Sequence, residues 1–365
     1  MSFSSDEASV MLGKNNDVAT KLTNKNPYLF VSHCITHRLA LACNSAQKKM
    51  VFCKYIETLI KETYNFFSNA KKRVDTLRQF QSVLDYLILK IKNIFEIRWL
   101  SWYEAVKSIC ISIKPLLDTF LEIATTTSFQ RQQSIFDLYS KICNWKVLVF
   151  LHFLYDILGY LMELSKMFQR RYIMFSDIDP IINSTIQKIQ HEYLDIDDYG
   201  NPKLSAHLND FLLKIPSAED SIGDHHILFK SEDKINLQLE IMEFAAAVIC
   251  KINDRFPHRL ILSAMKIINP MEWSKDKESL VDYGKEELEK LINIYGIAKE
   301  PNYPMPIIDA DSICDEWNNF KAIVLANYEK LSTDDFLPLL FQYHSDMYPN
   351  NLVLISIFYS IPFLV

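Results

Sequence analysis

The chain has 365 residues, of which 49% are hydrophobic and 23% charged, and this composition excludes disorder over most of the length. Its formal net charge is −6, so the protein as a whole is not expected to have strong nonspecific affinity for DNA. Only six residues are glycine, which favours long helices over a hairpin-rich β fold. The length predicts about two domains.

The first part of the chain predicts two strands joined by a helix. Residues 1–5 are expected to end a strand, which places Asp6 at its carboxyl edge. Residues 7–24 carry apolar side chains at helical spacing and predict a helix. Residues 28–34 form a short apolar, partly β-branched run that fits a buried strand.

Nearly all of the remaining chain predicts helix. Apolar residues recur every three or four positions from residue 37 to 80, with one or two breaks, and residues 138–168 predict a buried helical hairpin. Basic residues gather at Lys48-Lys49, at Lys71-Lys72-Arg73 and at Arg78. A charge run of this kind is usually a solvated helix face, and the alternative is a local nucleic-acid patch.

The seven cysteines are widely spaced, odd in number and without a Cys-x-x-Cys pair. We therefore expect reduced, mostly buried thiols in an intracellular protein, nuclear or cytoplasmic. The most apolar run, residues 147–162, is interrupted by His152 and Asp156 and is shorter than the roughly 20 residues of a membrane span. No membrane partner is expected.

Three positions are candidates for chemistry on residue type alone. A strand-end aspartate such as Asp6 can hold Mg²⁺ or Mn²⁺ in a nuclease, although an aspartate after serines is more often a helix cap. Cys34 and His37 are three residues apart, but no second Cys/His pair lies at the spacing of a zinc finger. An arginine beside a tryptophan, as in Arg98-Trp99, can hold a phosphate and stack on an unpaired base, or can simply be a surface Arg next to a core Trp.

These segments, taken in order, resemble the catalytic core of hAT-family DNA transposases. The run from Asp6 to Leu22 is similar to the family's Asp-Gly-Ala-Ser-x-Met-x-Gly block, with Glu7 and Asp17 departing from common residues of that block. The segment from His33 to Ala42 resembles the Cys-x-x-His block, and Arg98-Trp99-Leu100-Ser101 retains every fixed position of the Arg-Trp-x-Ser motif. Blocks at 268–273, 282–287 and 295–296 resemble domesticated, zinc-finger-linked hAT relatives.

The resemblance implies an α/β fold that is mostly α by residue count, with a partial ribonuclease-H-like core interrupted by a large all-α insertion. It divides the chain into a core segment (1–97), an all-helical insertion domain (98–306) and a C-terminal dimerisation region (307–365). It also implies that the chain is truncated at both ends relative to the family, because one of three catalytic carboxylates, Asp6, is matched. Magnesium or manganese would bind only in a full active site.

The resemblance also assigns roles to residues. Asp6 would be the remaining second metal-binding carboxylate, and DNA would be contacted by Cys34, His37, Arg98 and Trp99. The C-terminal segments resemble the family's dimerisation region, with Trp317, Tyr348, Pro349, Leu352, Ile355 and Ile361 as the expected contact residues. We expect a transposase-derived protein that binds DNA weakly and forms a dimer without cutting. The alternatives are a metal-dependent transposase or nuclease completed by missing segments, and a helical scaffold for protein interactions.

Overall fold

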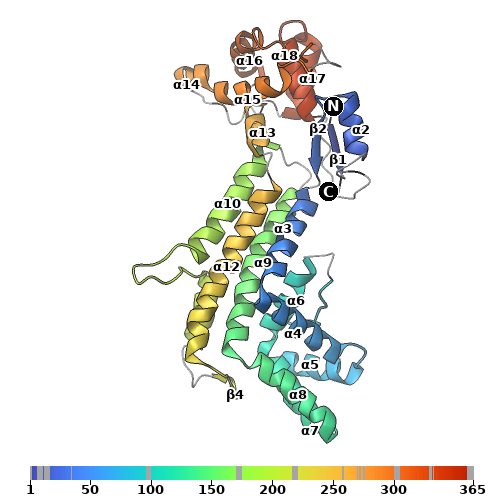
Figure 1. Cartoon of the computed structure of the whole chain (residues 1–365), viewed down its shortest axis with the longest axis vertical. Helices are drawn as coiled ribbons and strands as arrows, with labels where there is room; N and C mark the ends of the chain where they lie inside the picture. Colours follow the sequence, from blue (N-terminus) through green and yellow to red (C-terminus); the bar gives the residue numbers. More distant parts are fainter. Residues whose placement is uncertain are drawn as a thin grey trace. The chain divides into compact units, whose positions relative to one another are not determined.

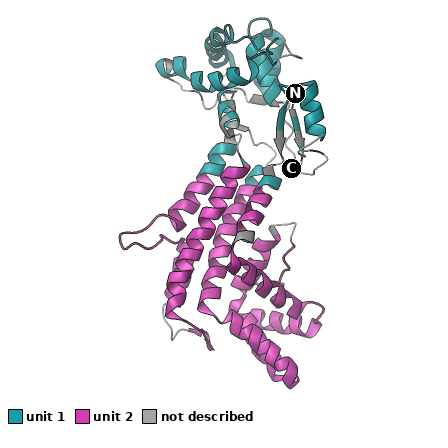
Figure 2. Cartoon of the chain, viewed as in Figure 1, with its two compact units in different colours: residues 1–38, 167–183, 256–365 teal, residues 39–166, 184–255 magenta. Residues whose placement is uncertain are grey.

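The computed structural model describes residues 2–5, 11, 17–33, 35–95, 100–169, 175–215, 221–256, 259–268, 270, 273, 276–299, 305–328, 331 and 333–359. Helix makes up 74% of this structure and strand 5%, which confirms the expectation of a mostly helical chain. The chain divides into two compact units (Figure 2). Unit 1 contains residues 1–38, 167–183 and 256–365, and unit 2 contains residues 39–166 and 184–255.

These units do not follow the three segments expected from the sequence. Residues 39–97 belong with the helices assigned to the insertion, and residues 256–306 belong with the C-terminal segment. The physical reason is packing, since α5 (Lys71–Val83) lies against α7 (Ile113–Thr125) within one unit. A helical periodicity shows which face of a helix is apolar, but not which other helix covers that face.

Unit 2 is built from helices and one short hairpin (Figure 1). Its elements are α3 (Ile35–Lys49) from residue 39, α4 (Val51–Phe67), α5, α6 (Leu100–Ile111), α7, α8 (Phe129–Ile142), α9 (Trp145–Phe168) up to residue 166, α10 (Phe175–Tyr193) from residue 184, α11 (Ala206–Lys214), the hairpin β3 (Ser221–Ile222) with β4 (His225–His226), and α12 (Ser231–Arg255). The predicted helices between residues 37 and 80 are confirmed as α3, α4 and α5. The predicted hairpin at 138–168 is α8 and α9, although α8 begins earlier, at Phe129.

The core of unit 2 is centred on α9. The amide N–H of Val147 donates to Oδ1 of Asn144 at 3.2 Å, which caps the helix start. The rings of Phe150 and Phe153 are fully buried and meet Phe244 of α12 at 6.4 and 5.7 Å between centroids. Within the described part of the chain, α9 alone is long and apolar enough to cross a membrane, and 72% of that apolar stretch is buried in the protein, which is the pattern of a core helix.

Unit 1 contains a β-α-β segment near the N-terminus. Strand β1 (Ser2–Ser5) pairs in parallel with β2 (Phe30–His33), so both predicted strands are confirmed. Helix α2 (Val18–Lys25) lies in the second part of the helix predicted over residues 7–24, residue 11 is also helical, and residues 7–10 and 12–16 lie outside the described residues. Asp17 caps α2, because its carboxylate accepts a 2.8 Å hydrogen bond from the amide of Thr20.

The C-terminal part of unit 1 is a helical cluster around aromatic side chains. It contains α13 (Arg259–Ala264), the 3₁₀ turn η1 (Met265–Ile268), α14 (Lys277–Asp282), α15 (Lys285–Tyr295), α16 (Ile313–Tyr328), α17 (Thr333–Tyr343) and α18 (Pro349–Tyr359). The ring of Trp317 lies 5.6 Å from Trp273 and 5.9 Å from Phe320, and Phe320 lies 5.6 Å from Tyr348. The cluster is tied to the N-terminal segment by Tyr28, whose hydroxyl donates to the carbonyl of Ile297 at 2.7 Å.

Candidate nucleic-acid interface

The β-α-β segment brings the carboxyl ends of its two strands to one edge. Ser5 is the register partner of His33, and the carboxyl ends of parallel strands meet at the same edge of a sheet. The next residues in the chain are Asp6 and Cys34, and both lie outside the described residues. His37 is described and lies in α3 with a half-buried side chain. The strand pairing fixes the register of Ser5 and His33, and the roles expected for Asp6 and Cys34 stay predictions.

Arg98 and Trp99 also lie outside the described residues, but the ends of the segment that contains them are fixed. The hydroxyl of Ser101 accepts a 2.8 Å hydrogen bond from the amide of Phe95 and donates to the carbonyl of Phe95 at 3.2 Å. The serine of the Arg-Trp-x-Ser motif thus joins the described residues on either side of 96–99.

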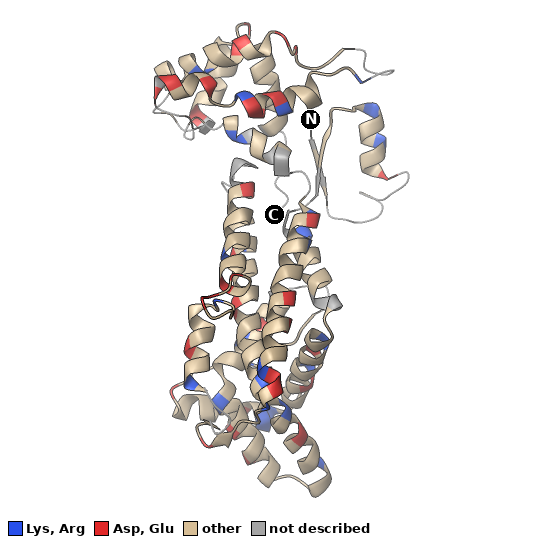
Figure 3. Ribbon diagram, turned by 60° about the vertical axis from the view of Figure 1, so that its left-hand side comes forward, with Lys and Arg blue, Asp and Glu red and all other residues tan. Residues whose placement is uncertain are grey.

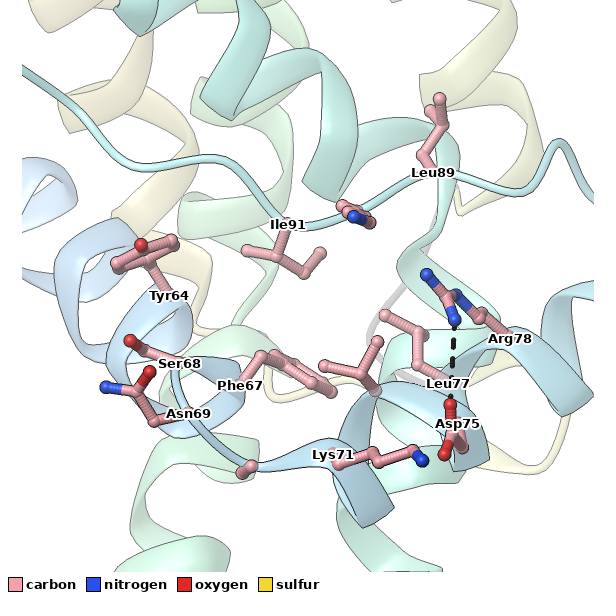
Figure 4. A pocket seen from close by; sticks show the side chains of 13 residues that line it. Tyr64, Phe67, Ser68, Asn69, Lys71, Asp75, Leu77, Arg78, Leu89 and Ile91 are labelled. Carbon is pink, nitrogen blue, oxygen red and sulfur yellow. Dashed lines mark ion pairs between the residues drawn. The ribbon is translucent and has the colours of Figure 1, made fainter.

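The basic residues around the α4–α5 turn line a pocket of about 530 Å³ in unit 2 (Figure 4). We call it the α4–α5 pocket. Its lining residues are Tyr64, Phe67, Ser68, Asn69, Ala70, Lys71, Val74, Asp75, Leu77, Arg78, Leu89, Lys90 and Ile91. In Figure 4, Phe67 and Leu77 lie between Tyr64 and Asn69 on one side and Arg78 and Asp75 on the other. The pocket therefore has an apolar floor with charged side chains around it.

One wall of the pocket is an extended segment, residues 86–95, which we call the strap. The side-chain amide of Gln81 donates to the carbonyl of Leu89 at 3.0 Å and to the hydroxyl of Ser112 at 2.8 Å. The amide of Lys92 donates to the hydroxyl of Ser108 at 3.3 Å. Because Gln81 and Ser108 are buried, these bonds hold the strap firmly against α5 and α6.

The cations around the pocket differ in how tightly they are held. Arg73 is structural, because its Nη1 donates to the carbonyl of Phe66 at 2.7 Å and its guanidinium lies 4.3 Å from the centre of the Phe66 ring. Arg78 lies 3.6 Å from the Asp75 carboxylate, and both side chains are about half exposed, so this ion pair contributes little. Lys71 and Lys90 are exposed. Lys71, Arg78 and Lys90 are therefore the cations best placed to hold an anion.

The start of α5 adds to the positive character of the pocket. The helix begins with Lys71, Lys72 and Arg73, has no acidic residue in its first turn, and lacks a side-chain cap at Ala70. Cations at this end oppose the helix dipole by about 0.3–1 kcal/mol each. A bound anion would offset that repulsion. Elsewhere, basic and acidic residues are interspersed along the helices (Figure 3).

The sequence identified Lys71, Lys72, Arg73 and Arg78, but not Tyr64 or the strap with Lys90. A possible signal was the alternation of apolar and basic residues in Leu89-Lys90-Ile91-Lys92, which is typical of an extended segment with one buried face. The other predicted basic pair, Lys48-Lys49, lies at the end of α3, and the pocket lining does not include it.

The residues predicted for dimerisation are mostly internal to unit 1. Trp317, Tyr348, Leu352 and Ile355 are buried in the chain's own core, Pro349 is exposed as the first residue of α18, and Ile361 lies outside the described residues. Trp317 also donates from its ring nitrogen to the carbonyl of Tyr283 at 3.0 Å. Glu316 accepts from the amides of Asn350 and Asn351 at 3.0 and 3.3 Å and so caps α18.

Two histidine clusters join elements of unit 2. His207 Nδ1 lies 2.7 Å from Asp156 Oδ1, and His207 Nε2 lies 3.3 Å from His152 Nδ1. His225 Nε2 lies 2.8 Å from Asp118 Oδ1, and its Nδ1 lies 3.1 Å from the hydroxyl of Tyr139. Neither cluster supplies a metal site, since no group of three His, Cys, Asp or Glu suited to a metal ion occurs among the described residues.

The six described cysteines are free thiols, and four of them are buried. Burial raises the pKa of Cys43 and of Cys53 to about 12, because an apolar environment disfavours the thiolate. These two side chains therefore act as small hydrophobic groups, as the sequence predicts. Cys34 lies outside the described residues.

Neither the known protein families nor the solved structures that were compared contain a match to this chain.

Proposed function

We propose that the chain is a hAT-transposase-derived nucleic-acid-binding protein with a partial ribonuclease-H-like core. The observation that carries the binding function is the α4–α5 pocket, where Lys71, Arg78 and Lys90 surround an apolar floor. Three cations against one carboxylate, Asp75, give this surface a local positive charge despite the overall charge of −6. The proposed core is supported by the parallel pairing of β1 with β2 across α2.

Binding should be weak and strongly dependent on salt, because a few lysines and arginines contact phosphates while the rest of the protein repels them. The test is fluorescence anisotropy with labelled DNA at several salt concentrations. We expect replacement of Lys71, Arg78 and Lys90 by glutamine to weaken binding similarly for all sequences. Arg73 should not be included in the variant, because its loss would also unfold the α4–α5 turn. Tight, sequence-selective binding that survives high salt would contradict the proposal.

We propose nucleic-acid binding as the function, and among the residues of this sequence Asp6 matches one of the family's three metal-binding carboxylates. The alternative is a metal-dependent nuclease. Purified protein should leave supercoiled plasmid intact in the presence of manganese. Nicking by the wild type that is absent in Asp6→Ala would favour the nuclease instead.

We also propose self-association through unit 1. Because four of the six residues predicted for this role are buried, the contact would need exposed apolar side chains, and Phe341, Tyr343 and Met347 are 41%, 64% and 58% exposed. Analytical ultracentrifugation should show a weak dimer that Phe341→Glu/Tyr343→Glu converts to a monomer. Leu213→Glu, at a 76% exposed position of unit 2, is the matched control. A monomer over a wide concentration range in the wild type would exclude the dimer and favour a scaffold that binds other proteins.

A further inference from the structure

We infer that the α4–α5 pocket receives one unpaired nucleotide of a single strand, with the base on the apolar floor and the neighbouring phosphates on Lys71, Arg78 and Lys90. This inference rests on the proposed nucleic-acid binding and specifies its ligand. It differs from the proposal above in a testable way, because a duplex offers the same phosphates but keeps its bases paired and stacked.

The floor of the α4–α5 pocket is apolar. Phe67, Leu77 and Ile91 are 5%, 2% and 7% exposed, and they present apolar surface at the bottom of a recess of about 530 Å³. This volume lies within the range of about 300–1,000 Å³ that small-molecule sites occupy. A phosphate alone would leave the apolar floor uncovered. A ligand that carries both a flat apolar group and negative charge fits the whole pocket, and a nucleotide has both.

One side of the pocket carries an aromatic ring, that of Tyr64. Tyr64 is half-buried at the last turn of α4, and Figure 4 shows its ring beside Ser68 and Asn69. Bases of single strands commonly stack on exposed aromatic rings, and each such contact contributes about 1–3 kcal/mol. An acidic peptide with one apolar side chain has a similar charge, but it would gain less from a ring face. The observations therefore favour the nucleotide over the peptide.

The cations of the pocket come from two different elements. Lys71 and Arg78 project from α5, whereas Lys90 projects from the strap, so positive charge comes from two different elements around the floor. A strand whose base enters the pocket has phosphates on both sides of that base. The strap is held by Gln81 and Ser108, so Lys90 is carried on a backbone that is already in place before binding.

The pocket also allows a variant that fills it without changing its charge. Ala70 lines the pocket and precedes α5 without making a side-chain capping bond, so Ala70→Phe loses no hydrogen bond. Its φ of −121° lies outside the left-handed region, so the backbone at this position does not require glycine. Lys72→Gln is the matched charge control, because Lys72 is exposed in the same helical turn but does not line the pocket.

The experiment measures anisotropy of a labelled oligothymidine of about 12 nucleotides, a usual footprint for single-strand binding, and of a duplex of the same length. We expect the single strand to bind more tightly. Ala70→Phe should lower single-strand affinity by about fivefold or more and leave duplex affinity unchanged, as expected from the loss of one stacked base. The double variant Lys71→Gln/Lys90→Gln should reduce the slope of log single-strand affinity against log salt by about 1.4. The control Lys72→Gln should change this slope little.

The outcomes separate this inference from the proposed function. Equal binding of single strand and duplex, with no effect of Ala70→Phe, would overturn the nucleotide pocket and leave nucleic-acid binding intact. If neither the single strand nor the duplex binds, both the nucleotide pocket and the proposed nucleic-acid binding are overturned. Both are also overturned if a phenylalanine-containing oligoglutamate peptide binds and oligothymidine does not. Far-UV circular dichroism and the thermal midpoint check that each variant is folded. If Ala70→Phe does not fold, Tyr64→Leu serves instead, with the same expected loss for the single strand.

Discussion

Both units bury polar side chains, but they use them differently. In unit 2 the buried groups join helices that are distant in sequence, as Asp156 of α9 does with His207 of α11. In unit 1 the buried polar groups form hydrogen bonds with backbone groups at helix ends. The Nζ of Lys321 donates to the carbonyls of Leu280, Val281 and Tyr283 at 2.6, 3.1 and 3.0 Å, at the end of α14. A cation at a helix C-terminus and an acid such as Glu316 at an N-terminus are both favourable for the helix dipole.

This difference predicts the pH range in which the stability of each unit changes. In unit 2, the hydrogen bond to Asp156 raises the pKa of His207, and burial lowers the pKa of His152 to about 3. In unit 1, burial lowers the pKa of Lys321 to about 8. The stability of unit 2 should therefore depend on pH on both sides of 6.5, and that of unit 1 should change through Lys321 above about pH 8. The following substitutions test this contrast, from the largest expected effect to the smallest.

The largest effect is expected from Trp317→Ala in unit 1. The side chain is 3% exposed, contacts Trp273 and Phe320, and donates a hydrogen bond to Tyr283. Its loss should lower the free energy of unfolding by about 3–5 kcal/mol. Urea unfolding, with hydrogen exchange of peptides from α16 and α9, measures the total loss and its location. Exchange that rises equally in both units would contradict a local role, and Val281→Ala, at a 57% exposed position, is the control.

The next effect is expected from Lys321→Met, which keeps the length of the side chain and removes its hydrogen bonds. Three carbonyls lose their donor, so the variant should be less stable by about 3 kcal/mol. Burial lowers the pKa of Lys321 to about 8 from 10.5. The unfolded chain thus binds more protons between these values, so the wild type should gain stability as pH rises from 8 to 10.5. A variant that retains this gain would exclude Lys321 as its source.

Asp156→Asn in unit 2 should have a smaller effect. The carboxylate is 8% exposed, accepts from the hydroxyl of Ser205 at 2.6 Å, and lies beside His207. The amide keeps the shape but loses the charge, and the expected loss is about 2 kcal/mol, since hydrogen bonds to charged groups contribute about 1.5–3 kcal/mol. Hydrogen exchange should increase in α11 and remain unchanged in α16. An effect confined to unit 1 would show that the contrast between the units is wrong.

Local features of the fold could be predicted from the sequence. The two strands of unit 1 and the helices that follow residue 37 were found, because apolar spacing and turn residues are local signals. The cap at Asp17 that begins α2 was not predicted, because it depends on one hydrogen bond to Thr20. The hairpin of β3 and β4 was not predicted as a pair of strands, and it turns at Gly223 with a φ of 62°.

The candidate site could be predicted only in part. The basic run of α5 is visible in the sequence, but the pocket requires Gln81 to reach Ser112, 31 residues away, and to hold the strap in place. The aromatic and apolar residues near the C-terminus, such as Trp317 and Leu352, were expected to contact a second chain. They are buried within unit 1 instead, because an apolar pattern reports burial without identifying the partner that causes it.

The smallest effect is expected from pH, and it tests the contrast between the units most directly. The pKa of His207 is raised, first through its hydrogen bond to Asp156, so the folded state should gain stability as pH falls through that pKa towards 6.5. Burial lowers the pKa of His152 to about 3, with the positive charges of His207 and Lys214 adding to the effect. Below pH 6.5 the unfolded chain therefore binds a proton that the folded state does not, and stability should fall.

Unit 2 should thus be most stable near pH 6.5 and lose about 2 kcal/mol or less between pH 6.5 and 5, because one proton contributes at most about 1.4 kcal/mol per pH unit. His152→Leu should remove the acid side of this profile and leave the alkaline side, since the leucine fills the apolar contact with Phe211 without titrating. His207→Gln should remove the alkaline side. Asp210, which also acts on His207, remains in both variants, so it does not distinguish them. Hydrogen exchange of α9 and α11 against pH is the measurement, with α16 as the internal reference. A profile in α16 that follows that of α9 would mean that the two units do not respond to pH separately.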